Sequence, residues 1–303
     1  MSLAPSVAVP RPTFNWLPLL IALFCLLWSF AFVAGKTAVT YCPPLILLTA
    51  RFLLAGILIL AISALRGERW PLTLRDTLVF ALIGVANNSL FLGLGYTGLQ
   101  SVSAGLGGLI VSANPVFTAV LAALLLNEQL TWRKIAGLLL GVIGVGLIVW
   151  HRLSVGTDSA HGILFSLASL ASIVAGTILF KLLAPKGSLW VGNGVQNLAA
   201  GIVLIPFAVT LADIGDVVPN LQLLGSFAFL TLGGSVLAYI LWFHLLRVCG
   251  ATAASAYHFL MPPLGMLFAF LVLGEHVEAR DLLGIIPVAL GIYLVTRSGR
   301  AAA

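Results

Sequence analysis

Charged residues are scarce in this chain of 303 residues, and no Asp or Glu lies in the middle of any of its long apolar runs. Only 8% of the residues are charged, whereas 61% are hydrophobic and the mean hydropathy is +1.14. A soluble domain carries about 25% charged residues. The longest segment between apolar runs, residues 152–162, leaves no room for a soluble domain. The sequence therefore predicts a polytopic integral membrane protein with the lipid bilayer as its surroundings.

Cysteine and metal-ligating patterns are also nearly absent. The three cysteines, Cys25, Cys42 and Cys249, are odd in number, and two of them lie in or beside apolar runs. This excludes a disulfide framework and a zinc site. The acidic turn 275–281 contains His276 but no HExxH motif, so we predict no metal ion.

Signals for nucleic acid and for nucleotide cofactors are equally weak. The net charge is +6, but the bases stand singly at the ends of apolar runs rather than in a stripe on one surface. We therefore predict no nucleic-acid partner. Gly93, Gly95 and Gly98 spell GxGxxG, yet no strand precedes them, so we predict no cofactor. The charges do not cluster at one membrane face, as the acid, base or metal groups of a membrane enzyme would, and we predict no enzymatic activity.

Ten apolar runs are long enough to cross a bilayer, five in each half of the chain. They lie near 14–35, 43–65, 74–97, 101–126, 133–150, 161–183, 188–211, 221–247, 251–273 and 281–297. The first is longer than the apolar part of a signal peptide and lacks a basic segment before it beyond Arg11, so we interpret it as an uncleaved span.

Basic residues accumulate on cytoplasmic sides of membrane proteins. With a cytoplasmic N-terminus, eleven of the fifteen bases fall inside and Lys36, Arg152 and Arg280 fall outside, while Arg51 lies within a span. The sequence thus predicts that both termini are cytoplasmic, in the inner (plasma) membrane of a bacterial cell.

A segment in the first half of the chain recurs in the second half, 147 positions later. The matching pairs are Pro115 with Pro262, Glu128 with Glu275, Arg133 with Arg280, Gly137 with Gly284 and Gly144 with Gly291. An odd number of spans per half inverts the second half relative to the first. We therefore predict an all-α protein of ten transmembrane helices in two inverted repeats at 14–150 and 161–298, with tails at 1–13 and 299–303. Such repeats build transporters that bind substrate near the midplane.

The phrases that carry a family resemblance extend over most of the chain. They are LLWSFAFVAGKTAV and PPLILLTARFLLAG in the first two spans, SANPVFTAVLAALLLNEQLT in the fourth and GATAASAYHFLMPPLGMLFAFLVLGE in the ninth. The chain resembles the EamA-type transporters of the drug/metabolite transporter superfamily, and within it most resembles the YddG-type exporters of aromatic and other neutral amino acids. The resemblance implies a basket of helices around a central cavity, with the fifth and tenth spans at its periphery.

Candidate binding residues are the polar and aromatic side chains inside the spans, because polar groups in hydrocarbon usually face a wet cavity or glue helices together. The predicted substrate-binding set is Trp28, Asn87, Asn88, Tyr96, Ser112, Asn114, Gln196, Asn197, Tyr239, Trp242, Tyr257 and His258. Asparagine and glutamine both donate and accept hydrogen bonds, so a ring of amides can hold a zwitterion without a fixed countercharge.

Three further features keep more than one interpretation. Pro115 and Pro262 remove a backbone hydrogen bond inside their spans, which serves either a hinge or a static kink. Arg51 either meets a substrate carboxylate or caps helix carbonyls, and its ARF context favours a structural role. The small-xxx-small pair Gly137 and Gly141 favours close helix packing, and leaves a monomer and a weak homodimer both open.

Together these features predict a secondary transporter that exports small neutral or amphipathic metabolites, amino acids including aromatic ones, by alternating access. Proton-coupled carriers usually contain carboxylates within the membrane, so their absence favours facilitated transport. The alternatives are an exporter of drugs or lipophilic cations from the same superfamily, a lipid-handling membrane protein and, more remotely, a channel.

Overall fold

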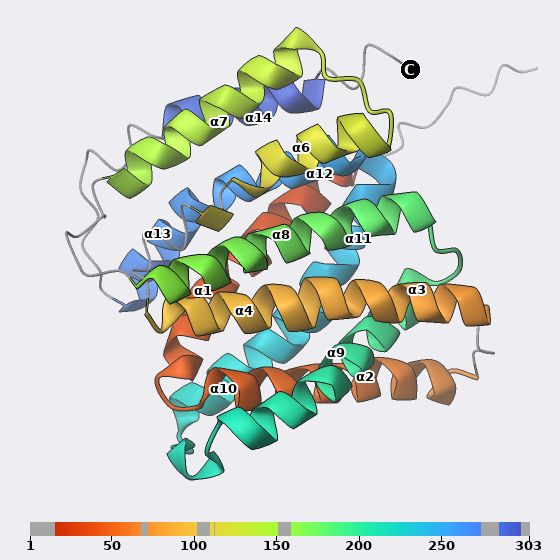
Figure 1. Ribbon diagram of the computed structural model, residues 1–303, viewed down its shortest axis with the longest axis vertical. Helices are drawn as coiled ribbons and strands as arrows, with labels where there is room; N and C mark the ends of the chain where they lie inside the picture. The colour runs from red at the N-terminus through yellow and green to blue at the C-terminus, as the bar shows by residue number, and fades with distance from the viewer. Residues whose placement is uncertain are drawn as a thin grey trace, which may run out of the picture.

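The computed structural model describes residues 16–67, 72–101, 110–111, 113–150, 159–273 and 285–297. Within these ranges every regular element is a helix, and the helices run roughly alongside one another in a bundle (Figure 1). Seven helical segments in the described residues are long and apolar enough to cross a membrane. The prediction of an all-α membrane protein is confirmed at this level.

The first half begins with two long helices, α1 (Leu17–Val39) and α2 (Pro44–Leu65). A third span follows as α3 (Leu74–Gly84), the π-helical segment η1 (Val85–Leu90) and α4 (Phe91–Leu99). Thr73 caps α3, because its hydroxyl oxygen accepts a hydrogen bond from the Asp76 backbone N–H at 3.1 Å. The half ends with α6 (Asn114–Leu125) and α7 (Trp132–Trp150).

The second half contains α8 (Ala160–Leu183) and α9 (Leu189–Leu211), which are capped by the side chains of Ser159 and Ser188. A short 3₁₀ turn, η2 (Ile214–Asp216), precedes a span made of α10 (Leu221–Phe229), the π-helical segment η3 (Leu230–Ala238) and α11 (Tyr239–Cys249). The next span consists of α12 (Ala251–Ala256), the 3₁₀ turn η4 (Tyr257–Leu260) and α13 (Met261–Leu273). The last described helix is α14 (Ile285–Arg297).

Helices from the two halves pack against each other throughout the bundle. The pair α2 and α9 lies at one edge of Figure 1 and the pair α7 and α14 at the opposite edge. Between them α4 packs on α8, α3 on α9, and α1 on both α13 and η3.

Glycines allow the closest of these crossings. A Cβ atom on Gly84 would lie 2.5 Å from the Gln196 Cα, and one on Gly137 would lie 2.6 Å from the Gly291 carbonyl oxygen. Small residues let helix backbones approach each other in this way in membrane proteins.

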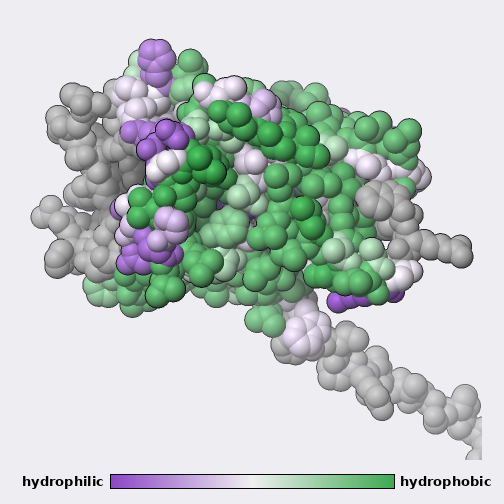
Figure 2. All heavy atoms as spheres, turned by 90° about the horizontal axis from the view of Figure 1, so that it is seen from below, coloured by the Kyte–Doolittle hydropathy of each residue, from purple (hydrophilic) through white to green (hydrophobic). Residues whose placement is uncertain are grey.

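The outer surface is strongly apolar. Large side chains such as Leu65, Leu124 and Leu221 are 87%, 71% and 85% exposed. Figure 2 shows hydrophobic residues across the visible face, with hydrophilic residues gathered toward its ends. A surface of this extent would aggregate in water, and it fits a protein whose sides face lipid.

Candidate functional site

Aromatic side chains from three separate spans meet in the middle of the bundle. We call this cluster the aromatic box, and it consists of Phe24, Trp28, Tyr239, Trp242 and His258. The Trp28 and Tyr239 ring centroids are 5.2 Å apart, and those of Trp242 and His258 are 4.8 Å apart. All five residues are at least nine-tenths buried. The box therefore brings together four of the residues predicted from the sequence.

The spacing of the box residues along the chain places those of one helix on the same face of that helix. Phe24 and Trp28 are four residues apart on α1 and so lie on the same side of that helix. Tyr239 and Trp242 are three residues apart on α11, and His258 lies on η4. The neighbouring residue Tyr257 is also buried, and its carbonyl oxygen accepts a long hydrogen bond from the Cys25 thiol at 3.9 Å.

The two π-helical segments place backbone carbonyls beside the box. A π-helical stretch shifts the hydrogen-bond register from i+4 to i+5 and often marks a functional site. In η1 the Asn87 carbonyl accepts a hydrogen bond from the Tyr239 hydroxyl at 2.6 Å. In η3 the Ser235 carbonyl accepts one from the Asn193 amide at 2.9 Å. The first of these bonds joins the aromatic box directly to the amide-bearing segment of η1.

Asn87 and Asn88 carry polar side chains that lack hydrogen-bond partners. Both are no more than 1% exposed, and neither side-chain amide has a hydrogen-bond partner among the described residues. Gly176 on α8 leaves the space that Asn87 occupies, because a Cβ at that glycine would overlap the amide. A buried amide without a partner costs about 1–3 kcal/mol. The pair is therefore suited to hydrogen-bond a guest molecule.

The other predicted amides are held to different degrees. The Asn114 side-chain oxygen accepts a hydrogen bond from Thr118 at 3.0 Å, while its nitrogen has no partner within the described ranges. Gln196 is fully buried, and neither its side-chain oxygen nor its nitrogen has a partner there. Asn197 donates to Asn193, which gives it a structural role in part. Ser112 lies outside the described residues.

The two prolines of the repeated segment each occupy the second position of an α-helix. Pro115 is the second residue of α6, and Pro262 is the second residue of α13, directly after the 3₁₀ turn η4. In the first turn of a helix the missing N–H leaves no intrahelical bond unmade. Pro262 also lies inside the continuous helical span Ala251–Val272, where the 3₁₀ turn η4 passes into α13.

Arg51 is buried at the centre of α2 with only 3% of its surface exposed. Its Nε donates a hydrogen bond to the Ser235 hydroxyl at 2.8 Å, and its guanidinium also lies within hydrogen-bonding reach of Tyr96. Tyr96 is half-buried on α4, and its hydroxyl fills the space that Gly35 leaves on α1. Tyr96 therefore belongs to the surroundings of Arg51 rather than to the aromatic box.

Glu128 joins the turn after α6 to the start of α12. Its carboxylate accepts hydrogen bonds from the Ala251 N–H at 2.8 Å and from the Thr252 hydroxyl at 2.7 Å. The connection between α11 and α12 is the single residue Gly250, whose φ of 83° is in the region that favours glycine. A carboxylate at the N-terminus of a helix is stabilised by the helix dipole.

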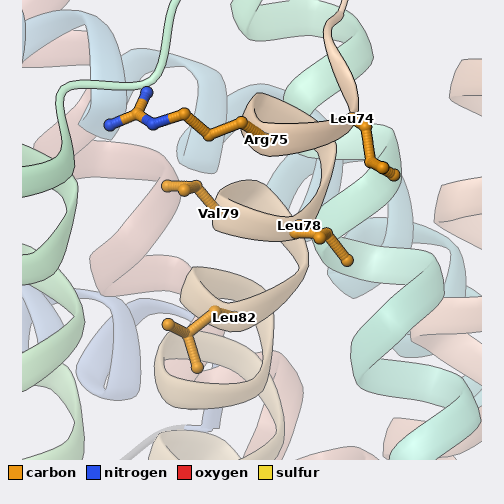
Figure 3. A pocket seen from close by; sticks show the side chains of 5 residues that line it. All are labelled: Leu74, Arg75, Leu78, Val79 and Leu82. Atoms are coloured by element: carbon orange, nitrogen blue, oxygen red, sulfur yellow. The ribbon is translucent and has the colours of Figure 1, made fainter.

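The described residues support neither a metal-ion site nor a substrate pocket on α3. The described residues contain no group of three or more His, Cys, Asp or Glu side chains that could hold a metal ion. A shallow pocket of about 440 Å³ lies on α3, and Figure 3 shows the side chains that line it. Leu74, Leu78 and Leu82 are four residues apart on the exposed face of that helix, so this pocket belongs to the apolar outer surface.

Sequence reasoning missed Phe24 and Glu128 as parts of this region. Phe24 is one of seventeen phenylalanines in an apolar chain, and only its spacing of four residues from Trp28 connects it with the box. Glu128 was recognised as part of the repeated segment, but its partner Thr252 is 124 positions away. No short-range pattern predicts that contact.

Comparison with known proteins assigns the chain to a family. The sequence profile of the EamA-like transporter family matches residues 15–150 and again residues 160–297. An uncharacterized transporter of Synechocystis sp. is 28% identical over 89% of this chain and 87% of its own length. An uncharacterized inner membrane transporter of Escherichia coli, YedA, is 28% identical over 92% of this chain and 91% of its own length.

The fold also has a counterpart among solved structures. One crystal structure superposes with a TM-score of 0.79 over 94% of this chain and 98% of the other, at 17% identity, which shows the fold alone. The double profile match covers most of the sequence and agrees with the lipid-facing surface of the helical bundle. The chain therefore belongs to the EamA-like transporter family and is a multi-pass membrane transporter.

Proposed function

We propose that this transporter exports small neutral or amphipathic metabolites, in particular amino acids including aromatic ones, across the inner membrane. The observation that carries the proposal is the junction of the aromatic box with the unpartnered amides of Asn87 and Asn88. Aromatic rings offer an apolar surface to a side chain, while amide groups both donate to a carboxylate and accept from an ammonium group. A substrate with both features would repay the cost of burying these amides.

The proposed architecture is ten transmembrane helices in two inverted five-helix repeats, 14–150 and 161–298, with both termini cytoplasmic. This architecture is supported by the family profile, which matches once in each half of the chain. When residues 85–90 of η1 are moved by 147 positions they fall on 232–237, inside η3. The packing of the span formed by α3, η1 and α4 on α8 has a counterpart in that of the span formed by α10, η3 and α11 on α1.

The proposed mechanism is alternating access, in which the two halves rock about α6 and α13 and expose the central site to each side in turn. The arrangement that supports it is the 3₁₀ turn η4, because a short 3₁₀ stretch within a span often marks a hinge. Pro115 and Pro262 begin the helices on either side of the site and are the proposed hinge residues. A monomer suffices for this mechanism, and a weak homodimer is compatible with it.

Counterflow in liposomes tests the substrate. Liposomes that contain the purified protein and are loaded with unlabelled phenylalanine should exchange it for external labelled phenylalanine, tryptophan or leucine. Asn87→Ala or Asn114→Ala should lower the rate at least about tenfold, the equivalent of one hydrogen bond to a charged group. The exposed amide variant Gln100→Ala should transport normally. If no amino acid exchanges, the amino-acid assignment is wrong while the transporter assignment stands.

Transport should also be independent of a proton gradient. The sequence has no Asp or Glu in the middle of any span, and buried carboxylates usually relay protons in coupled carriers. Imposing a pH difference of one unit across the liposome membrane should therefore leave the final substrate ratio at one. Accumulation against the substrate gradient would contradict facilitated transport and direct attention to His258, the titratable side chain in the aromatic box.

A lipophilic-cation exporter is the second candidate, and the aromatic box is the observation that favours it. A cation over an aromatic face gains about 0.5–2 kcal/mol. The same liposomes would then take up tetraphenylphosphonium faster than any amino acid.

A further inference from the structure

Arg51 is a buried positive charge without a negative partner among the described residues. It lies about eight residues into α2, far from either end of that 22-residue helix. No Asp or Glu carboxylate in the described ranges forms an ion pair with it. Ionised side chains within membrane spans are costly, and they usually mark a substrate or ion pathway.

The contacts that Arg51 does make are with neutral groups. Its Nε donates to the Ser235 hydroxyl, and Tyr96 is within reach of the guanidinium. A guanidinium has five N–H donors in a fixed fork, which is more than the Ser235 and Tyr96 hydroxyl groups can accept. Gly234 lets the guanidinium pack directly against η3, because a Cβ there would lie 2.7 Å from the Arg51 Nη2 atom.

A purely structural role does not account for this arrangement. The Arg51 guanidinium lies 5.4 Å from the centroid of the Phe52 ring, but that contact is with its own neighbour in the chain. Arg51 is not the sole anchor of η3 among the described contacts, because the Asn193 and Asn197 amides also donate to the Ser235 carbonyl. Removing one partner of a buried ion pair is strongly unfavourable. Arg51 has no ion-pair partner among the described residues, so its removal would leave no opposite charge unpaired there.

The position of Arg51 connects it to the central site. Ser235, its hydrogen-bond partner, lies four residues before Tyr239 of the aromatic box. The Tyr239 hydroxyl in turn donates to the backbone of Asn87. A chain of contacts thus runs from the guanidinium past the box to the unpartnered amides.

We propose that Arg51 binds the carboxylate of the substrate. The inference rests on the proposed function and narrows it to molecules that carry a carboxylate group beside an apolar side chain. The carboxylate accepts hydrogen bonds from the Arg51 fork, the apolar part packs in the aromatic box, and an amino group, where present, donates to the amide oxygens of Asn87 and Asn88. Planar bidentate recognition of this kind is specific to arginine. A lipophilic cation would meet a like charge at Arg51, so this proposal favours the first candidate function over the second.

Thermal unfolding in detergent separates the chemical groups that the site recognises. Three ligands share one phenyl group: L-phenylalanine, 3-phenylpropanoate, which lacks the amino group, and 2-phenylethylamine, which lacks the carboxylate. At about a hundredfold excess over Kd, the first two should raise the melting temperature of the wild-type protein by about 5 °C. The amine should leave it unchanged.

Variants then assign the effect to the guanidinium. Arg51→Met should abolish the shift caused by 3-phenylpropanoate and stop phenylalanine counterflow, yet leave the melting temperature of the ligand-free protein unchanged or higher. Arg51→Lys should keep a smaller shift, because it retains the charge without the fork. Arg247→Met is the matched control and should keep the full ligand shift. Arg247 lies near the end of α11, and it donates to the carbonyls of Pro185 and Gly187 in the connection between α8 and α9.

Three results would overturn the proposal. They are equal stabilisation of the wild-type protein by the amine and by the carboxylate, an undiminished carboxylate shift in Arg51→Lys, and normal counterflow in a folded Arg51→Met variant. The first comparison needs no variant, so it holds even if Arg51→Met fails to fold. If 3-phenylpropanoate stabilises only proteins that contain Arg51 but no amino acid exchanges, the amino-acid assignment fails and the carboxylate site stands.

Discussion

Replacing Gly84 with alanine should destabilise the protein by about 3 kcal/mol and lower its melting temperature in detergent by about 6 °C or more. The added Cβ would lie 2.5 Å from the Gln196 Cα and 2.7 Å from its carbonyl carbon. These are backbone atoms of α9 and cannot rotate away, so α3 and α9 would have to separate. Gly84 is also three residues before Asn87, and the separation would displace the amides of η1 from the aromatic box.

A second glycine offers a matched control for that substitution. Gly225 lies on the exposed side of α10, and a Cβ there would have no heavy atom within 4 Å. Alanine favours the helix by about 1 kcal/mol over glycine, so Gly225→Ala should keep or slightly raise the melting temperature. Equal stability of the two variants would show that α3 and α9 are not in close backbone contact.

Replacing Glu128 with alanine should open the contact between the turn after α6 and the N-terminus of α12. The carboxylate accepts hydrogen bonds from two backbone N–H groups and from the Thr252 hydroxyl. Losing such charge-assisted bonds costs about 2–3 kcal/mol, which changes the ratio of closed to open states by about 30- to 150-fold. A carrier that must close this contact once in every cycle would slow accordingly.

The native thiol of Cys249 reports on this opening. It lies at the end of α11, is half-buried and forms no disulfide, whereas Cys25 and Cys42 are buried. In a Cys25→Ala, Cys42→Ala background, a maleimide should label Cys249 at least about tenfold faster in Glu128→Ala than with Glu128 intact, in line with the shift toward the open state. Gln129→Ala, in the same turn and exposed, should label at the background rate. Unchanged labelling in Glu128→Ala would show that the contact does not hold the two segments together.

Much of the helical arrangement follows from apolar length alone. The run predicted at 43–65 coincides with α2, and the run at 221–247 with α10, η3 and α11. The two π-helical segments could not be predicted, because the residues of 85–90 and 230–238 carry no local pattern for an i+5 register. Their backbone carbonyls are satisfied by Tyr239, Asn193 and Asn197, residues that are distant along the chain.

The candidate site was partly foreseeable for a similar reason. A tryptophan or histidine inside an apolar run is conspicuous, which is why Trp28, Trp242 and His258 could be selected before their proximity was known. Phe24 and Gly176 are ordinary residues in such runs, and only the packing of α1 and α8 gives them a part in the site. For Arg51 the sequence favoured a structural role because of its ARF context, and its contacts with Ser235 and Tyr96 become visible only when its neighbours are known.

The 3₁₀ turn η4 has neighbouring side chains that face opposite sides of the bundle. His258 packs against Trp242 in the aromatic box, whereas Phe259 fills the space beside Gly141 on α7. The helix α7 in turn meets α14 backbone to backbone at Gly137 and Gly291. A guest that pushed His258 outward would therefore press Phe259 against α7 through the short backbone of η4, and would so couple the central site to the peripheral helix pair.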